Sequence, residues 1–147
     1  MRIWIKNPLA ILAEKADAGI VIDGSKIMEL VPAGQQPNSK YDSVFNAEDH
    51  VVIPGLINLH HHFYQTLTRV FPSALNRELF PWLKTLYPIW AKLTPEAMSL
   101  GSQLALAELL LSGCTTACDH HYVFPNGLEK AIDYQIEEAQ NLGIRVV

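Results

Sequence analysis

An apolar run that ends in three consecutive histidines constrains the fold of this chain more than any other feature. The run covers residues 51–59 and leads directly into His60, His61 and His62. Branched aliphatic residues are typical of a strand that is buried on both faces, and Pro54-Gly55 marks the point where the chain should bend. Because side chains alternate along a strand, His60 and His62 should point to one side and His61 to the other.

Two imidazoles on one face of a strand, with Cα atoms about 6 to 7 Å apart, can bind a single metal ion. The alternative is a solvated turn in which the histidines cluster by accident. We favour the metal site, because the match includes the strand, the Pro-Gly entry, the His-x-His spacing and a polar continuation.

This stretch also carries a family resemblance. Residues 54–62 resemble the first-strand signature of the amidohydrolase superfamily, and residues 62–69 and 80–88 are similar to its aminohydrolase branch, whose members deaminate purines and triazines. The resemblance implies that His60 and His62 bind one catalytic divalent metal, zinc first and iron second, at the mouth of a TIM barrel. It implies a purine-like amino-heterocycle as substrate, 8-oxoguanine first, with guanine, isocytosine, triazines and S-adenosylhomocysteine as related possibilities.

Length limits what the chain can do alone. A closed (β/α)8 barrel needs about 200 to 250 residues, and this chain has 147. We therefore expect an α/β protein that forms part of a TIM barrel, with residues 1–50 as the amino-terminal part of a small β-sandwich and residues 51–147 as the first β/α units. The resemblance puts the general base, the acid and the other metal ligands beyond Val147, so no catalytic residue is expected within the chain.

The remaining elements follow from local patterns. Residues 3–5, 19–22, 26–30 and 41–46 are predicted strands, with a hairpin turn at Asp23-Gly24. Residues 63–93 are predicted to be a loop with short helical pieces, because three prolines are spaced through them. A helix is expected from Thr94 to Ser112, a strand at 114–119, a helix ending at Gly143 and a strand at 144–147, which predicts parallel pairing. The predicted buried residues of the first helix are Leu100, Leu104, Ala107 and Leu111, and those of the second are Leu128, Ala131, Ile132, Ile136, Ala139 and Leu142.

Three further residues are candidates for substrate binding. Gln65 can present an amide to a heterocycle edge, although it could equally be a surface glutamine. Trp82 belongs to an aromatic stripe that usually indicates core packing, and the resemblance alone puts it near a substrate. His121 and its neighbour His120 follow the strand at 114–119, and one of them is either a substrate contact or a hydrogen-bonded loop histidine. They are not expected to be metal ligands, because adjacent strand residues point to opposite faces. Asp119 is expected to be structural, since a lone acid carries no acid-base argument.

Charge and cysteine content exclude several other classes. A net charge of −4 and a pI near 5.8 argue against a phosphate-binding surface, so we expect no nucleic-acid partner. No segment reaches the roughly 18 apolar residues of a membrane span. Cys114 and Cys118 would lie about 13 Å apart along a strand, too far for a disulfide. Free thiols favour a reducing cytoplasm.

Two classes of function stay open at this point. One is a metal-dependent aminohydrolase of which this chain is an incomplete amino-terminal portion. The other is a non-catalytic metal-binding or assembly module, a half-barrel that pairs through its open edge with another chain. Both predict a homo-oligomer or a complementing chain as partner.

Overall fold

The computed structural model describes residues 1–147 and divides the chain into two compact units, Met1–Pro54 and Gly55–Val147. Both sheets and helices are present, so the chain belongs to the α/β class. Each unit is described by itself below. No helix has the length and apolar composition needed to cross a bilayer.

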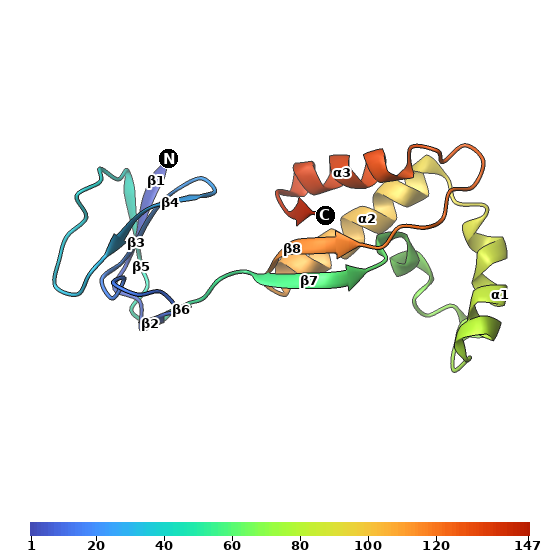
Figure 1. Ribbon diagram of the computed structural model, residues 1–147, viewed down its shortest axis with the longest axis horizontal. Coiled ribbons are helices and arrows are strands. Elements are labelled where there is room, and N and C mark those ends of the chain that lie inside the picture. Colours follow the sequence, from blue (N-terminus) through green and yellow to red (C-terminus); the bar gives the residue numbers. More distant parts are fainter. The chain divides into compact units, whose positions relative to one another are not determined.

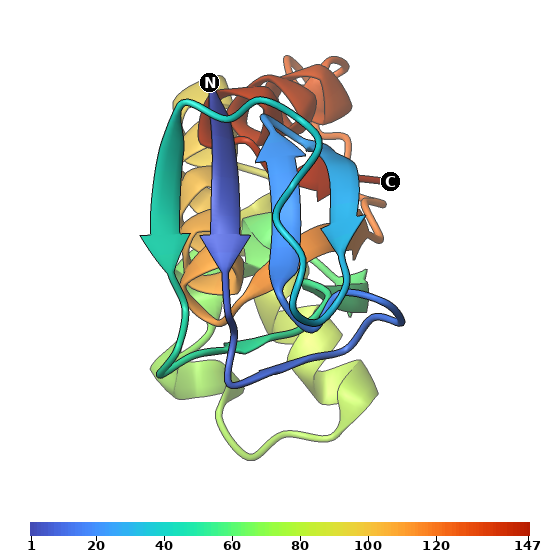
Figure 2. The same ribbon diagram turned by 90° about the vertical axis from the view of Figure 1, so that its left-hand side faces the viewer.

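The first unit is built on a four-stranded sheet in the order β4-β3-β1-β5. Its strands are β1 (Arg2–Lys6), β3 (Gly19–Asp23), β4 (Lys26–Val31) and β5 (Ser43–Asn46). Figure 2 shows the four strands side by side, with β1 antiparallel to β3 and parallel to β5. The predicted strands are thus confirmed, although the last one begins at Ser43 and not at residue 41.

Trp4 and Gly19 explain why this sheet packs as it does. The indole of Trp4 is buried with Ala18, Val21 and Val31, and its Nε1 donates a hydrogen bond to the carbonyl of Ala18 at 3.2 Å. Gly19 has a φ of 111°, and a Cβ there would collide with the carbonyl oxygen of Ile5. Only glycine therefore allows β1 and β3 to approach each other at this point.

The hairpin between β3 and β4 is confirmed, but its turn is shifted by one residue from the prediction. Asp23 pairs with Lys26, so the turn residues are Gly24 and Ser25. Gly24 has a φ of 55°, which suits the first central position of a two-residue hairpin turn. Asp23 instead ends the strand, where its carboxylate accepts a hydrogen bond from Arg2 Nε at 3.0 Å.

The apolar run at residues 51–59 forms two strands, and the prediction of one continuous strand was wrong. β6 (Val51–Val52) pairs in parallel with β2 (Ala10–Ile11) in the first unit, whereas β7 (Leu56–His61) belongs to the second. Gly55 separates them and packs so closely on Thr115 that a Cβ would overlap the threonine side chain. The predicted burial of both faces was also wrong, because Ile57 and Leu59 are 64% and 75% exposed.

The second unit contains a parallel three-stranded sheet in the order β7-β8-β9. Besides β7 it comprises β8 (Cys114–Asp119) and β9 (Arg145–Val146), and the connections contain η1 (Phe63–Thr68), η2 (Pro72–Ala74), α1 (Leu79–Trp90), α2 (Pro95–Leu111) and α3 (Ala131–Leu142). Figure 1 shows α2 and α3 together on one side of β7 and β8. The predicted alternation with parallel pairing is confirmed, and Cys114 and Cys118 are both free thiols as expected.

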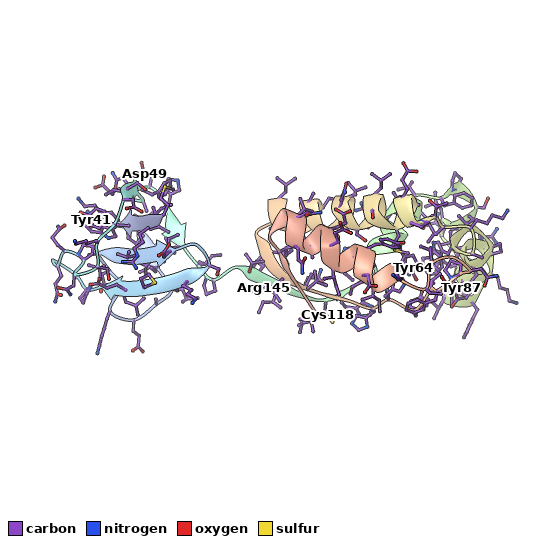
Figure 3. All side chains as sticks on the ribbon, turned by 90° about the horizontal axis from the view of Figure 1, so that it is seen from above. Tyr41, Asp49, Tyr64, Tyr87, Cys118 and Arg145 are labelled. Atoms are coloured by element: carbon purple, nitrogen blue, oxygen red, sulfur yellow. The ribbon has the colours of Figure 1, made fainter.

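The segment expected to be a loop contains a twelve-residue helix, α1. Pro81 lies in its first turn, where a missing N–H costs little. Pro88 lies inside the helix, and packing compensates for the donor that it removes, because Leu86 and Trp90 are fully buried. Trp90 contacts both Tyr64 and Tyr87 at ring centroid distances of 5.3 and 5.7 Å, and Figure 3 shows the two tyrosines at this end of the unit.

Helix α2 begins and ends where the sequence predicts. The Thr94 hydroxyl accepts a hydrogen bond from the amide of Ala97 at 3.1 Å, and Gly113 follows the helix with a φ of 84°. The predicted buried face was wrong, since Leu100 and Leu111 are 51% and 89% exposed. This helix carries apolar residues on all of its sides, so the periodicity of the sequence could not identify the buried face. The side that packs inward is Met98, Gly101, Ser102, Ala105, Leu106 and Leu109.

Helix α3 begins at Ala131, so Leu128 lies in the turn before it, although it is buried as expected. Ala131 and Ala139 face the core, but Ile132 and Ile136 are exposed, contrary to the prediction. The two isoleucines line a cavity of about 210 Å³ beside Val146 and Val147. Gly143 ends the helix with a left-handed φ of 77°.

Candidate active site

His60 and His62 lie together at the carboxyl end of β7. Their Nε2 atoms are 3.1 Å apart, and their rings meet edge to face with centroids 5.0 Å apart. The contact between these two rings agrees with the predicted alternation of side chains along the strand. Two nitrogen ligands of a tetrahedral zinc ion would lie about 3.3 Å apart, so this separation matches two ligands of one metal. It also suits a hydrogen bond between the rings.

The second ring nitrogen of His62 is held by the backbone. Its Nδ1 lies 2.6 Å from the backbone carbonyl oxygen of His120. Since a carbonyl can only accept, Nδ1 carries the proton and Nε2 of the neutral ring presents its lone pair toward His60. Metal-binding histidines are usually oriented through a hydrogen bond of this kind on the second nitrogen.

The structure brings two candidate ligands together, and no third one joins them. No group of three or more histidine, cysteine, aspartate or glutamate side chains is arranged to hold a metal ion. A catalytic zinc ion usually has three protein ligands and an open position. His60 and His62 therefore fit a divalent metal as part of a larger ligand set.

His61 makes different ring contacts from this pair, although it lines the same cavity. Its ring packs against Phe63 with centroids 5.2 Å apart, and its buried Nδ1 has no hydrogen-bond partner. Burial lowers the pKa of His61, and the neighbouring Asp119 carboxylate opposes that shift. Burial therefore favours the neutral form of the ring.

Gln65 lies beside the histidines, on η1. A cavity of about 230 Å³ is lined by His60, His61, His62, Gln65, Thr66 and Arg69. The side-chain nitrogen of Gln65 donates to the hydroxyl oxygens of Tyr64 and Tyr122, at 3.2 and 3.0 Å. Burial raises the pKa of the Tyr64 phenol, so it stays protonated at neutral pH. Both amide N–H groups of Gln65 are thus used within the protein, and its Oε1 is left to accept from a ligand.

Trp82 and His121 lie elsewhere. Trp82 packs on Trp90 within α1, with ring centroids 5.3 Å apart, and does not line the histidine cavity. The side chain of His121 is 4% exposed, its Nε2 lies 2.8 Å from the carbonyl of Val123, and it lines the cavity beside α3. Burial lowers the pKa of His121. Contact of either residue with a substrate stays a prediction.

The structure shows what three residues at the end of β8 or directly after it contribute to the site: His120, which was a candidate substrate contact, Asp119, which was predicted to be structural, and Tyr122, which the sequence did not single out. The imidazole of His120 stacks on that of His60, with centroids 4.3 Å apart and planes within 8°. The Asp119 carboxylate accepts from the amide of Phe63 at 2.7 Å, and Tyr122 bonds Gln65. The only signal in the sequence was their place at the end of β8 or directly after it, because parallel strands bring their carboxyl ends to one edge.

Comparison with known proteins agrees with this geometry. The model of the amidohydrolase family matches residues 51–147, which include both histidines, Gln65 and all three strands of the parallel sheet. This chain belongs to the amidohydrolase family. The match covers the second unit and extends into β6.

Three known proteins illustrate which members of the family this chain is similar to. The chain is 58% identical to 8-oxoguanine deaminase of Pseudomonas aeruginosa over 99% of its own length and 33% of the relative's. It is 34% identical to hydroxydechloroatrazine ethylaminohydrolase of a Pseudomonas species, over 69% of the chain and 22% of that enzyme. The zinc complex of atrazine chlorohydrolase from Arthrobacter aurescens matches 98% of this chain and 34% of its own, with a TM-score of 0.83 and 27% identity.

All these relatives are much longer than this chain. The chain spans about a third of the 8-oxoguanine deaminase and of the atrazine chlorohydrolase that it matches. The activity of a whole enzyme can therefore be discussed only as a proposal.

Proposed function

We propose that this chain is the amino-terminal portion of a metal-dependent aminohydrolase that deaminates a purine-like heterocycle, with 8-oxoguanine as the first candidate. The observation that carries the proposal is the cavity shared by the His60–His62 pair and Gln65. The 58% identity to an 8-oxoguanine deaminase supports the choice of substrate. Zinc is the first candidate for the metal because a neighbour was solved with zinc, and iron is the second.

The proposed fold is a partial TIM barrel preceded by strands of a β-sandwich. Residues 51–147 would provide the first β/α units and residues 1–50 the sandwich strands. Parallel β7, β8 and β9 with α2 and α3 on one side support this arrangement. Active sites of such barrels lie at the carboxyl ends of the strands, where His60 and His62 are found.

The chain's own residues would bind and orient the reactants. His60 and His62 would hold the metal through Nε2, and the carbonyl of His120 would keep His62 in the required tautomer. Gln65 would accept a hydrogen bond from a ring N–H through Oε1, since its amide nitrogen is bound by two tyrosines. When bound, a divalent metal supplies Lewis-acid activation of water at neutral pH.

The reaction is a hydrolysis at the ring carbon that bears the exocyclic amine. The oxygen of water bonds to that carbon, the carbon–nitrogen bond breaks, and the amine leaves as ammonia after proton transfer. General acid and base groups would be supplied by the part of the enzyme that lies outside these residues. The proposal includes a reducing, cytoplasmic environment, which the two unpaired cysteines support.

Ammonia release tests the proposal. A polypeptide of the relatives' length that carries this chain would be incubated with 8-oxoguanine, guanine, isocytosine, a hydroxy-triazine and S-adenosylhomocysteine. We expect the highest kcat/KM for 8-oxoguanine. If no amino-heterocycle reacts while an N-acyl amino acid or a dihydropyrimidine does, the deaminase assignment fails and the family membership stands.

A further inference from the structure

Four consecutive residues that begin with the last residue of β8, Asp119–Tyr122, contact the segment 60–65 almost residue by residue. The amide of His120 donates to the carbonyl of His61 at 2.8 Å, and the carbonyl of His120 accepts from His62 Nδ1. At one end of this tetrapeptide, Asp119 accepts a hydrogen bond from the amide of Phe63. At the other end, the hydroxyl of Tyr122 accepts one from the side chain of Gln65. One short segment therefore reaches both the metal-binding pair and the proposed substrate-binding residue.

Asp119 is built into the protein interior. Its side chain is 5% exposed, and its Oδ2 accepts from Gln135 Nε2 of α3 at 2.8 Å while its Oδ1 accepts from Phe63 N at 2.7 Å. A buried carboxylate is costly unless such donors satisfy it. The amide of Phe63 follows His62 directly, so this hydrogen bond sets the direction in which the chain leaves the metal-binding strand.

Tyr122 acts on the other end of the segment. Its hydroxyl accepts from Gln65 Nε2 at 3.0 Å, and its ring lies edge to face with that of His62 at 5.3 Å. Together with Tyr64 it occupies both N–H groups of the Gln65 amide. Without this partner the amide could rotate and present a donor to the cavity instead of an acceptor.

We propose that Asp119 and Tyr122 are positioning residues, Asp119 for the His60–His62 pair and Tyr122 for the side-chain amide of Gln65. The inference rests on the proposed function for its substrate half and on the metal site alone for its other half. Neither residue would contact the reacting atoms. Replacing Asp119 should therefore reduce metal affinity, whereas replacing Tyr122 should reduce substrate affinity.

The metal half is tested by zinc affinity, measured by competition with a chelating dye in the full-length protein. Asp119→Ala removes the acceptor for Phe63 N and should weaken zinc binding about 10- to 100-fold. Asp119→Asn keeps an acceptor for that amide, and Gln135 can turn its own amide to accept from the new side chain. We expect Asp119→Asn to restore zinc affinity to within about threefold of the wild type.

Two further variants separate positioning from stability. Gln135→Ala removes the other donor to Asp119 and should lower the melting temperature without a comparable loss of zinc. Asp119→Leu, which keeps the branched shape of the side chain at a somewhat larger volume and leaves no cavity, replaces Asp119→Ala if circular dichroism shows that the alanine variant is unfolded. Wild-type zinc affinity in the apolar variant, or an equal zinc loss in Asp119→Asn and Asp119→Ala, would overturn the assignment of Asp119.

The substrate half is tested by a double-mutant cycle between Tyr122→Phe and Gln65→Ala. Tyr122→Phe should leave zinc affinity within about twofold and lower both 8-oxoguanine binding and kcat/KM by about 3- to 10-fold. In the Gln65→Ala background the same change should have no further effect. Tyr41→Phe, a tyrosine change in the first unit, is the matched control and should change neither quantity.

Additive effects of Tyr122→Phe and Gln65→Ala would overturn the assignment of Tyr122. If 8-oxoguanine neither binds nor reacts with the wild-type protein, the substrate half fails together with the proposed function. The zinc measurements then decide the role of Asp119 separately, because they require no substrate.

Discussion

At the scale of single residues, the direction of a side chain matters as much as its identity. His60, His61 and His62 are chemically alike, but the strand puts two Nε2 atoms 3.1 Å apart and turns the third ring toward Phe63. The carbonyl of His120 then selects one tautomer of His62. The orientation of the His62 ring is therefore set by the strand geometry and by a backbone acceptor from a distant part of the sequence.

The first prediction concerns metal content in the full-length protein. His60→Ala or His62→Ala should abolish stoichiometric zinc or iron, because each removes one ligand from an already small set. His61→Ala should leave the metal largely in place and serves as the matched control. Metal content would be measured by plasma mass spectrometry after dialysis. Equal metal loss in all three variants would contradict the prediction that His60 and His62 point to one side of the strand and His61 to the other.

A second prediction concerns Gln65. Gln65→Ala should lower kcat/KM by about 1 to 3 kcal/mol, or about 5- to 150-fold, since a polar group of the substrate loses its partner. Zinc content should not change, because the Gln65 side chain makes no hydrogen bond to either histidine of the pair, and the bond from its backbone amide to the His62 carbonyl at 3.0 Å is kept in the alanine variant. Steady-state kinetics with 8-oxoguanine would measure the effect. A variant with full activity and unchanged KM would remove Gln65 from the substrate site.

At the scale of elements, one carboxylate holds a loop to a strand in the first unit. Glu29 of β4 accepts hydrogen bonds from the backbone amides of Asn38 and Ser39 at 2.8 and 2.7 Å. These bonds lower the pKa of Glu29 to about 2 from an ordinary value of 4.5. The loop between β4 and β5 is thereby tied back to the sheet that precedes it.

The third prediction follows from the sign of this shift. Because the pKa of Glu29 is lower in the folded protein, its ionised form stabilises the fold at pH values above about 4.5. This contribution should decline as the pH falls from 4.5 and should vanish below about 2. Glu29→Gln should therefore lower the melting temperature at pH 7, and the difference from wild type should shrink through this window. A difference independent of pH would contradict the assigned cause.

At the scale of the whole molecule, exposed apolar side chains lie on the strand that carries the metal-binding pair. Leu56, Ile57 and Leu59 of β7 are all largely exposed. Ile57 and Leu59 share one face of this edge strand, and exposed apolar side chains on an edge strand are typical of an interface or of an aggregation-prone edge. The relatives are about three times as long as this chain, which is consistent with additional protein over this surface.

The fourth prediction concerns residues 1–147 produced alone. We expect this polypeptide to aggregate, to exchange elements between copies or to associate with a complementing chain, since the exposed face of β7 is apolar. Size-exclusion chromatography with light scattering would determine its mass. A monodisperse monomer that unfolds cooperatively would contradict this expectation. Replacing Ile57 and Leu59 by threonine should reduce association without changing β7.

Local sequence determined the features that depend on neighbouring residues. The alternation of His60 and His62, the Thr94 cap and the glycine that ends α3 all follow from rules that act within a few residues. Each could be predicted because no distant partner is needed. The parallel order of β7, β8 and β9 also followed from alternation of strands and helices along the chain.

Tertiary structure alone decided which surfaces are buried and which side chains meet. Periodicity could not select the inner face of α2, because apolar residues surround it, and packing overrode Pro88 to form α1. The links from Asp119 to Phe63 and from Tyr122 to Gln65 join residues more than fifty positions apart. Such contacts depend on strand register and chain path, which local patterns do not encode. The sequence therefore determined that His60 and His62 lie side by side, and only the fold decided which residues hold them in place.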